Sequence, residues 1–275
     1  MTDQYIMYYI IKLFQKQEID VDKTMKEQFS KMKTKVEELG KGDKYHYMEY
    51  AEGLFKLLNK KYDVKKIAFD SKNQTKKHMV LNTKKDNIMI SFDRNRFCRS
   101  VIPSKLPKIC GYNRNSNLWK TFESKYDDIC DKFVETYNDE VFSQISKNKM
   151  FTQLYLPINK LVVKTFNRKR RNAKELYQFI INDELKVIFV NATHKKYQVF
   201  ELNLDINQDD EPNGIYVKLD PNDPASIIMH FNNNLEFKLE LQYNAHKVSE
   251  KVALKYIVSL DNVDKYLIPL AKKTL

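Results

Sequence analysis

The spacing of apolar residues changes along this chain, and these changes constrain the fold more than any single motif does. Between residues 4 and 17, apolar side chains recur every three or four positions, as at Ile6 and Ile10. This spacing predicts an amphipathic helix. The same period predicts two further helices, over residues 22–40 and 47–58.

Beyond residue 64 the period shortens to two, and β-branched and aromatic residues become frequent. Three such segments, at 67–69, 79–81 and 88–92, predict a small sheet with a polar turn at 83–87. Pro103, Pro107 and Gly111 indicate a loop. Later in the chain, helical spacing gives way to strand spacing. The predicted helices are 119–133, 151–166 and 176–181, and the predicted strands are 187–190, 197–204, 215–219, 227–231, 235–243 and 253–258.

This order of elements predicts an α/β (α+β) fold, with a mixed sheet flanked by helices and a β-rich segment at the end of the chain. We expect two regions, a helix-rich one over residues 1–170 and a β-rich one over residues 171–275. Because no low-complexity linker separates them, we expect the two regions to pack as one body.

The composition indicates a folded, basic protein. Hydrophobic residues make up 42% of the 275 residues, which is enough to fill a core. The 48 Lys and Arg exceed the 36 Asp and Glu and give a net charge of +12, a surplus that attracts polyanions such as nucleic acid. No apolar run approaches the roughly 20 residues that span a bilayer, so we expect a soluble, cytoplasmic protein. Three cysteines without a CxxC pair predict free thiols: Cys98, Cys110 and Cys130.

Several catalytic and metal-binding patterns are missing from the sequence. The 5 histidines have no HxH or HExxH spacing, and neither a Gly-rich phosphate loop nor a GxSxG motif occurs. We therefore expect no cofactor and no metal site. Asp223, followed by Glu236-Phe237-Lys238, mimics the acid and acid-x-Lys pattern of a metal-dependent nuclease. We interpret Glu236, Lys238 and Glu240 as the solvent-facing side of an alternating strand.

Three blocks of sequence, in the same order, resemble the HaeIII family of type II restriction endonucleases, which have a PD-(D/E)xK-like site. Residues 235–245 read LEFKLELQYNA and precede Lys247-Val248 and Leu254-Lys255-Tyr256, where family members have GWQFSFRIHNA, a KV dipeptide and LKFD. Residues 176–203 are similar to a family segment in which a YLIG element leads into a strand ending QAFNL. Asp70-Ser71-Lys72 is similar to the family's SDSKG.

This resemblance implies a nuclease fold whose cutting residues are replaced. In the family, an Asp on one strand and a Glu on the next hold Mg²⁺, and a Lys orients or deprotonates the attacking water. The corresponding positions here are His78, Asn87 and Asp93. A histidine and an amide do not substitute for hard carboxylate ligands, and an Asp does not substitute for the Lys. The resemblance therefore implies a degenerate catalytic site.

Clusters of basic residues indicate where a DNA backbone would bind. The run at 168–171, with Lys164 and Lys174 beside it, carries no acid that would relieve its repulsion, although a solvated turn is the alternative. An Asn such as Asn244 pairs well with an adenine edge, and a turn-forming Asn is an equal alternative. The predicted DNA-binding residues are Lys76, Lys77, Arg94, Asn95, Arg96, Arg99, Arg168, Arg170, Arg171, Asn244, Lys247, Lys251 and Lys255.

These observations predict a protein that is derived from a HaeIII-like restriction endonuclease and binds double-stranded DNA without cutting it. A second hypothesis is an active Mg²⁺-dependent, site-specific endonuclease with relocated acids, whose candidate ligands are Asp70, Asp86, Asp93 and Glu49. A third is a structural or regulatory protein that keeps the fold and binds another protein. The oligomeric state and the preferred DNA sequence stay open.

Overall fold

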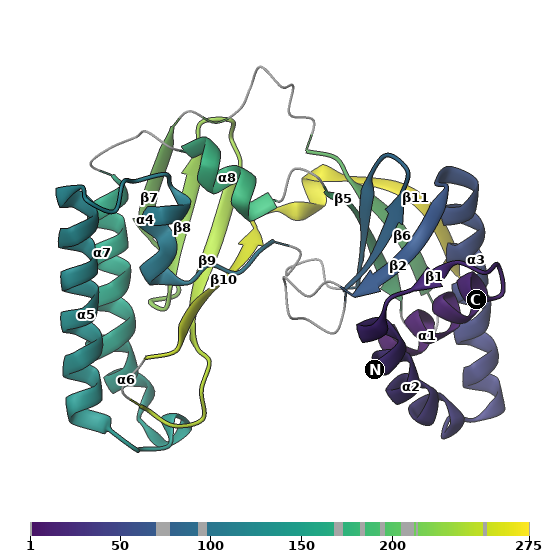
Figure 1. Ribbon diagram of the computed structural model, residues 1–275, viewed down its shortest axis with the longest axis horizontal. Helices are drawn as coiled ribbons and strands as arrows, with labels where there is room; N and C mark the ends of the chain where they lie inside the picture. The colour runs from purple at the N-terminus through teal and green to yellow at the C-terminus, as the bar shows by residue number, and fades with distance from the viewer. Residues whose placement is uncertain are drawn as a thin grey trace. The chain divides into compact units, whose positions relative to one another are not determined.

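In the computed structural model, the chain has a mixed α/β fold with two β-sheets, which confirms the predicted fold class. It divides into two compact units (Figure 1). Unit 1 comprises Met1–Phe97, Asp183–Leu204 and Val263–Leu275, and unit 2 comprises Cys98–Asn182 and Asp205–Asn262. The structure describes residues 2–69, 78–92, 98–167, 173–181, 185–192, 196–204, 212, 214–249 and 252–274.

Unit 1 is built on a seven-stranded mixed sheet whose strands come from distant parts of the chain. Neighbouring strands are antiparallel except at two places, where β2 lies parallel to β1 and β5 lies parallel to β4. In spatial order the strands are β1 (Asp20–Val21), β2 (Val64–Phe69), β3 (His78–Thr83), β4 (Asn87–Ser91), β5 (Leu185–Ala192), β6 (Lys196–Leu202) and β11 (Leu267–Thr274). A short helix, η5 (Val263–Tyr266), precedes β11.

The three predicted N-terminal helices are confirmed as α1 (Thr2–Gln15), α2 (Lys23–Glu37) and α3 (Lys41–Lys61). Asp22 begins α2, because its Oδ1 accepts a hydrogen bond from Met25 N at 2.7 Å. Apolar side chains of these helices, such as Ile6, share one buried cluster with sheet residues such as Leu81 and Ile188. Their burial against one face of the sheet provides the core of unit 1.

Unit 2 packs helices on a four-stranded antiparallel sheet, in the order β10-β9-β8-β7. Along β9 and β10, buried and half-exposed residues alternate, so one face is apolar. The strands are β7 (Ile215–Leu219), β8 (Ser226–Phe231), β9 (Glu236–Tyr243) and β10 (Leu254–Leu260). The helical segments are η1 (Pro103–Lys105), α4 (Leu106–Ile109), α5 (Asn117–Tyr137), η2 (Phe142–Gln144), α6 (Lys147–Met150), η3 (Phe151–Tyr155), α7 (Leu156–Phe166) and α8 (Ala173–Ile181).

The boundaries of the two units differ from the predicted division at residue 170. The cause is strand pairing: β5, β6 and β11 join β2–β4 in one sheet instead of joining the other C-terminal strands. A second difference concerns the predicted loop near Pro103 and Pro107, which contains η1 and α4. Both prolines stand in the first turn of a short helix, where the missing N–H costs no hydrogen bond.

A buried asparagine connects α7 to the sheet of unit 2. Asn159 is 0% exposed; its Oδ1 accepts a hydrogen bond from the Tyr256 hydroxyl at 2.7 Å, and its Nδ2 donates to Pro224 O at 3.1 Å. Tyr256 itself lies in β10 and is fully buried. The Tyr256 hydroxyl therefore has a hydrogen-bond partner at a place that water does not reach.

Removal of this amide should destabilise unit 2. We expect Asn159→Ala to lower the free energy of unfolding by about 1–3 kcal/mol, since it leaves the buried Tyr256 hydroxyl without its partner, and Tyr256→Phe by about half as much. Urea titration followed by circular dichroism measures both changes. Asn148→Ala, at an exposed position in α6, is the control and should change stability by less than about 0.5 kcal/mol. Equal effects of Asn159→Ala and Asn148→Ala would contradict this role.

Candidate functional site

The strand register separates the positions at which the HaeIII resemblance places the degenerate catalytic residues. His78 pairs with Ser91, whereas Asn87 pairs with Asn82 at the opposite end of the β3–β4 hairpin. The two predicted positions are thus four residues apart along the strands, or roughly 13 Å. Ligands of a single Mg²⁺ lie within about 2.1 Å of the ion. His78 and Asn87 therefore do not form one site, and Asp93 lies outside the described residues.

The polar groups near Asn87 are engaged with one another. Asn87 Oδ1 accepts a hydrogen bond from Asn82 Nδ2 at 2.6 Å. Asp86, one of the candidate relocated ligands, forms an ion pair with Lys186 on β5 at 2.8 Å, and the hydrogen bond to Asp86 raises the pKa of Lys186. Glu49 lies within α3, while Asp70, like Asp93, lies outside the described residues. The described candidates for the relocated acids thus come from different elements.

The charged residues of the nuclease-like pattern in unit 2 form two separate sets of ion pairs. Glu236 contacts His230 on β8 (Oε2 to Nδ1, 2.6 Å), while Lys238 Nζ lies 3.0 Å from both Asp220 Oδ2 and Asp223 Oδ2. Glu236 and Lys238 both occupy the half-exposed face of β9. The interpretation of this pattern as the outer side of an alternating strand is confirmed.

Both aspartates beside Lys238 have lowered pKa values. Burial by itself raises the pKa of Asp220, but the hydrogen bond from Asn222 N and the ammonium group of Lys238 outweigh it. Burial also raises the pKa of Asp223, and it is outweighed by hydrogen bonds from the Ser226 hydroxyl and Lys238. These contacts close the β7–β8 turn.

Only part of the predicted DNA-binding set can be placed. Arg99, Asn244, Lys247 and Lys255 belong to unit 2, whereas Lys76, Lys77, Arg94, Asn95, Arg96, Arg168, Arg170, Arg171 and Lys251 lie outside the described residues.

Three of the four placed residues, Asn244, Lys247 and Lys255, lie in or next to the β9–β10 connection, and Arg99 lies apart from them. Asn244 N bonds to Ala253 O, just before β10 begins, and Lys247 pairs with Val141 beyond the end of α5. Val101 forms an antiparallel bridge with Tyr256 on β10, so Arg99, two residues earlier, lies toward the other end of β10. The Arg99 guanidinium is 5.6 Å from the centre of the Phe179 ring. Strand register thus separates Arg99 from the β9–β10 connection.

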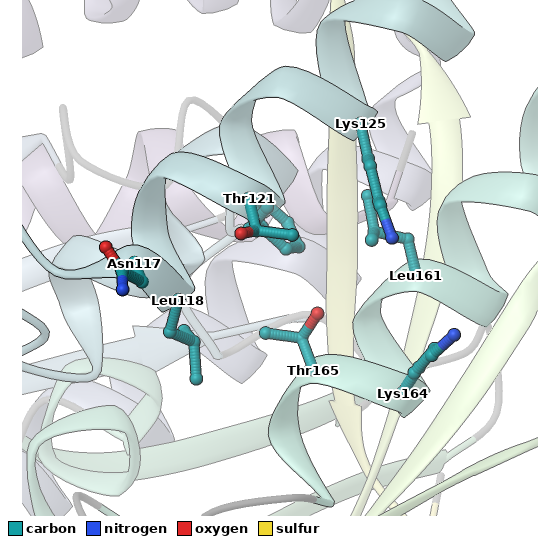
Figure 2. Close-up of a pocket in the computed structure, with 8 residues that line it drawn as sticks. Asn117, Leu118, Thr121, Lys125, Leu161, Lys164 and Thr165 are labelled. Atoms are coloured by element: carbon teal, nitrogen blue, oxygen red, sulfur yellow. The ribbon is translucent and has the colours of Figure 1, made fainter.

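A pocket between α5 and α7 brings together residues that the sequence patterns did not associate. Its volume is about 300 Å³, at the lower end of the range for ligand sites. Figure 2 shows Thr121 and Lys125 on α5 facing Leu161 and Thr165 on α7, with Lys164 at the edge. The lining residues are Asn117, Leu118, Thr121, Phe122, Lys125, Leu161, Lys164 and Thr165.

Local sequence signals explain how α5 and α7 form the pocket. Ser116 caps α5, because its Oγ accepts a hydrogen bond from Trp119 N at 3.3 Å. The buried stripe of α5, which includes Phe122 and Phe133, packs inward, and the intervening Thr121 and Lys125 are exposed. Pro157 occupies the first turn of α7. In Figure 1 the two helices lie side by side in unit 2.

The far end of α7 is fixed on the sheet by Asn167. Its Nδ2 donates to Val217 O at 2.6 Å, and its Oδ1 accepts from Val217 N at 2.8 Å. Val217 lies in β7, the outermost strand of the sheet, so the amide closes an edge that would otherwise present unpaired backbone groups. The basic run at 168–171 follows Asn167 directly in the sequence.

The residues that line the pocket differ in charge from their neighbours on α5. Around the pocket stand Lys125 and Lys164, and within the described part of the chain neither forms an ion pair. Toward the C-terminal half of α5, burial and then repulsion from Glu123, Asp131 and Asp128 raise the pKa of Asp127. The N-terminal end of α5 and the C-terminal end of α7 carry opposite partial charges. Lys125 and Lys164 are the charged residues among those that line the pocket, so the lining itself favours an anion.

The cysteines are confirmed as free thiols, and all three are buried in unit 2. Burial raises the pKa of Cys98 and of Cys110. Burial is also the largest cause that raises the pKa of Cys130, to about 12. Thiols of this kind are inert near neutral pH, so they play no part in the candidate site.

Comparison with known proteins gives one distant similarity. The chain is 24% identical over 286 aligned positions to an uncharacterized protein of Acanthamoeba polyphaga mimivirus, with 96% of each chain covered. No model of a protein family and no solved structure matches the chain. The resemblance to the HaeIII family stays a prediction. None of the helices in the described part of the chain is long and apolar enough to cross a membrane.

Replacement of Lys238 tests whether the Asp220–Asp223 cluster is structural. Carboxylates whose pKa is lowered by folding contribute stability above the pKa of the unfolded chain and lose it as the pH falls through the folded-state value. We expect Lys238→Met to lower the free energy of unfolding at pH 7 by roughly 1 kcal/mol, since solvent screens the pairs of a side chain that is 37% exposed.

The difference between Lys238→Met and the wild type should shrink as the pH falls from 7 toward about 3, where the carboxylates take up protons. Urea titrations across this range measure it. Lys218→Met, which replaces a lysine of the neighbouring strand β7, serves as the control. A difference that stays constant with pH would contradict the ion-pair interpretation.

Proposed function

We propose that the protein binds double-stranded DNA through its phosphate groups and does not cleave it. The observation that carries this proposal is the pair of lysines at the α5–α7 pocket, Lys125 and Lys164, which have no acidic partner within the described residues. Two lysines that line one pocket without an ion pair favour an anion between them. The net charge of +12 supports a polyanionic partner.

Further basic residues close to the pocket lysines in the sequence would add to the phosphate contacts that this proposal needs. Lys160 is exposed one helical turn before Lys164 on α7, and the run at 168–171 begins four residues after it. Arg114 is exposed in the turn that leads into α5. A duplex presents a phosphate charge about every 1.7 Å of its axis, so binding would involve several of these cations. Lys247 and Arg99, which lie elsewhere in unit 2, are secondary candidates.

The absence of cleavage rests on chemistry at the positions that the HaeIII resemblance assigns. His78 and Asn87 replace acids, and the Oδ1 of Asn87 is already an acceptor for Asn82. Asp86, which could have compensated, is paired with Lys186. We propose a cytoplasmic location, since three free thiols suit a reducing compartment.

Charge-removing variants at the pocket test the binding site. We expect Lys125→Ala/Lys164→Ala to weaken duplex binding for all DNA sequences alike and to reduce the slope of log K against log salt by about 2, roughly 1 for each lost phosphate contact. Fluorescence anisotropy with a labelled duplex, repeated at several salt concentrations, measures both.

The matched control is Lys26→Ala/Lys31→Ala on α2, which removes the same charge from exposed positions in unit 1. It should leave the salt slope within about 0.5 of the wild type. Duplex binding that ignores salt would refute the proposal, and equal losses in both double variants would remove the assignment to the pocket.

A cleavage assay separates this proposal from the active-nuclease hypothesis. Purified protein, incubated with mixed plasmid and phage DNA and Mg²⁺ or Mn²⁺, should leave the DNA uncut, because the predicted ligand positions do not supply two carboxylates to one ion. Discrete products on a gel would show that relocated acids still cut. Removal of divalent ions with EDTA should leave the duplex affinity unchanged.

A further inference from the structure

We propose that the α5–α7 pocket is a site for a nucleoside phosphate, with the base on an apolar floor and the phosphate between Lys125 and Lys164. This inference deepens the proposed function and rests on it, since it identifies the part of a nucleic acid that the pocket takes. The shared chemistry, an aromatic base joined to a phosphate, comes either from a free nucleotide or from the end of a strand.

The floor of the pocket is apolar and rigid. Leu118, Phe122 and Leu161 line it. Phe122 is 1% exposed, and its ring is held by Tyr126 and Phe166, each with a centroid 6.2 Å away. A flat, weakly hydrated base covers such a surface better than a hydrated inorganic ion does.

The rim is polar and matches the rest of a nucleotide. Asn117, Thr121 and Thr165 offer amide and hydroxyl groups to a sugar or to a base edge. An alkyl chain, as in a fatty acid, would leave these groups without a partner. Two lysine ammonium groups suit the dianion of a phosphate better than the single charge of a carboxylate.

The volume sets the size of the occupant. About 300 Å³ admits one nucleotide-sized molecule and is too small for a stacked base pair with its backbone. A base inside a duplex is stacked on both sides, so the pocket would receive an unstacked nucleotide, as at a strand end.

Trp119, the single tryptophan of the chain, provides a built-in reporter. It lies in the first turn of α5 next to Leu118, is 9% exposed, and its buried indole Nε1 has no hydrogen-bond partner among the described residues. Occupation of the pocket should therefore change its emission.

The test is a titration of the full chain with a nucleoside monophosphate, followed by Trp119 fluorescence and by calorimetry. We expect saturable binding at one site, weaker binding of inorganic phosphate and ribose 5-phosphate, and no measurable binding of the uncharged nucleoside.

Lys125→Met/Lys164→Met should weaken nucleotide binding at least about tenfold, the loss expected for two charge-assisted contacts. Leu161→Ala should weaken nucleotide binding without affecting that of inorganic phosphate. Lys26→Ala/Lys31→Ala is the control and should bind like the wild type.

Further measurements distinguish a free nucleotide from a strand end as the ligand, and show whether this inference or the proposed function fails. Tighter binding of a 5′-phosphorylated single strand than of the free nucleotide assigns the site to strand ends, and the reverse assigns it to free nucleotides; either outcome supports the pocket. Binding of uncharged nucleoside equal to that of the nucleotide, tighter binding of a fatty acid, or no nucleotide binding would overturn it. If salt-dependent duplex binding persists while nucleotides do not bind, only this inference fails. If duplex binding itself is absent, the proposed function fails.

Discussion

The candidate site depends on the attachment of α7 to the four-stranded sheet of unit 2. Two asparagines make this attachment: the buried Asn159 bonds to the Tyr256 hydroxyl and to Pro224 O, and Asn167 bonds to both backbone groups of Val217 at the sheet edge. With both ends of α7 fixed, its outer residues have one orientation toward α5. The pocket is a consequence of this arrangement, since Leu161 and Thr165 lie between the two anchors.

The apolar pattern of the chain was sufficient to predict nearly all helices and strands, because the segments are long and their periods are distinct. It did not predict which strands share a sheet. β5 pairs with β4, and β11 pairs with β6, through residues that lie 98 and 65 positions apart in the sequence, as in Asn87–Leu185 and Leu202–Leu267. No local pattern carries that information. The sequence pattern does not predict β1, because a two-residue strand has no period, or the eight-residue β11, because Pro269 interrupts its pattern.

For the candidate site, the sequence indicates basic residues but not which of them lie together. The basic run at 168–171 indicates Lys164 as part of a cationic cluster. No such pattern indicates Lys125, because it stands among acids on α5. Lys125 and Lys164 line the same pocket only because α5 packs against α7. Conversely, the positions assigned by resemblance to a nuclease site, His78 and Asn87, lie at opposite ends of a hairpin, because antiparallel register and not sequence spacing decides which residues face each other.

The central claim is that unpaired lysines at the α5–α7 pocket contact DNA phosphate. Lysine acetylation with mass-spectrometric readout, with and without a saturating duplex, tests it directly because a lysine against a phosphate reacts more slowly. The account predicts protection of Lys125 and Lys164, and unchanged labelling of Lys26 and Lys31. Unchanged labelling of Lys125 and Lys164 in the presence of bound duplex would contradict it.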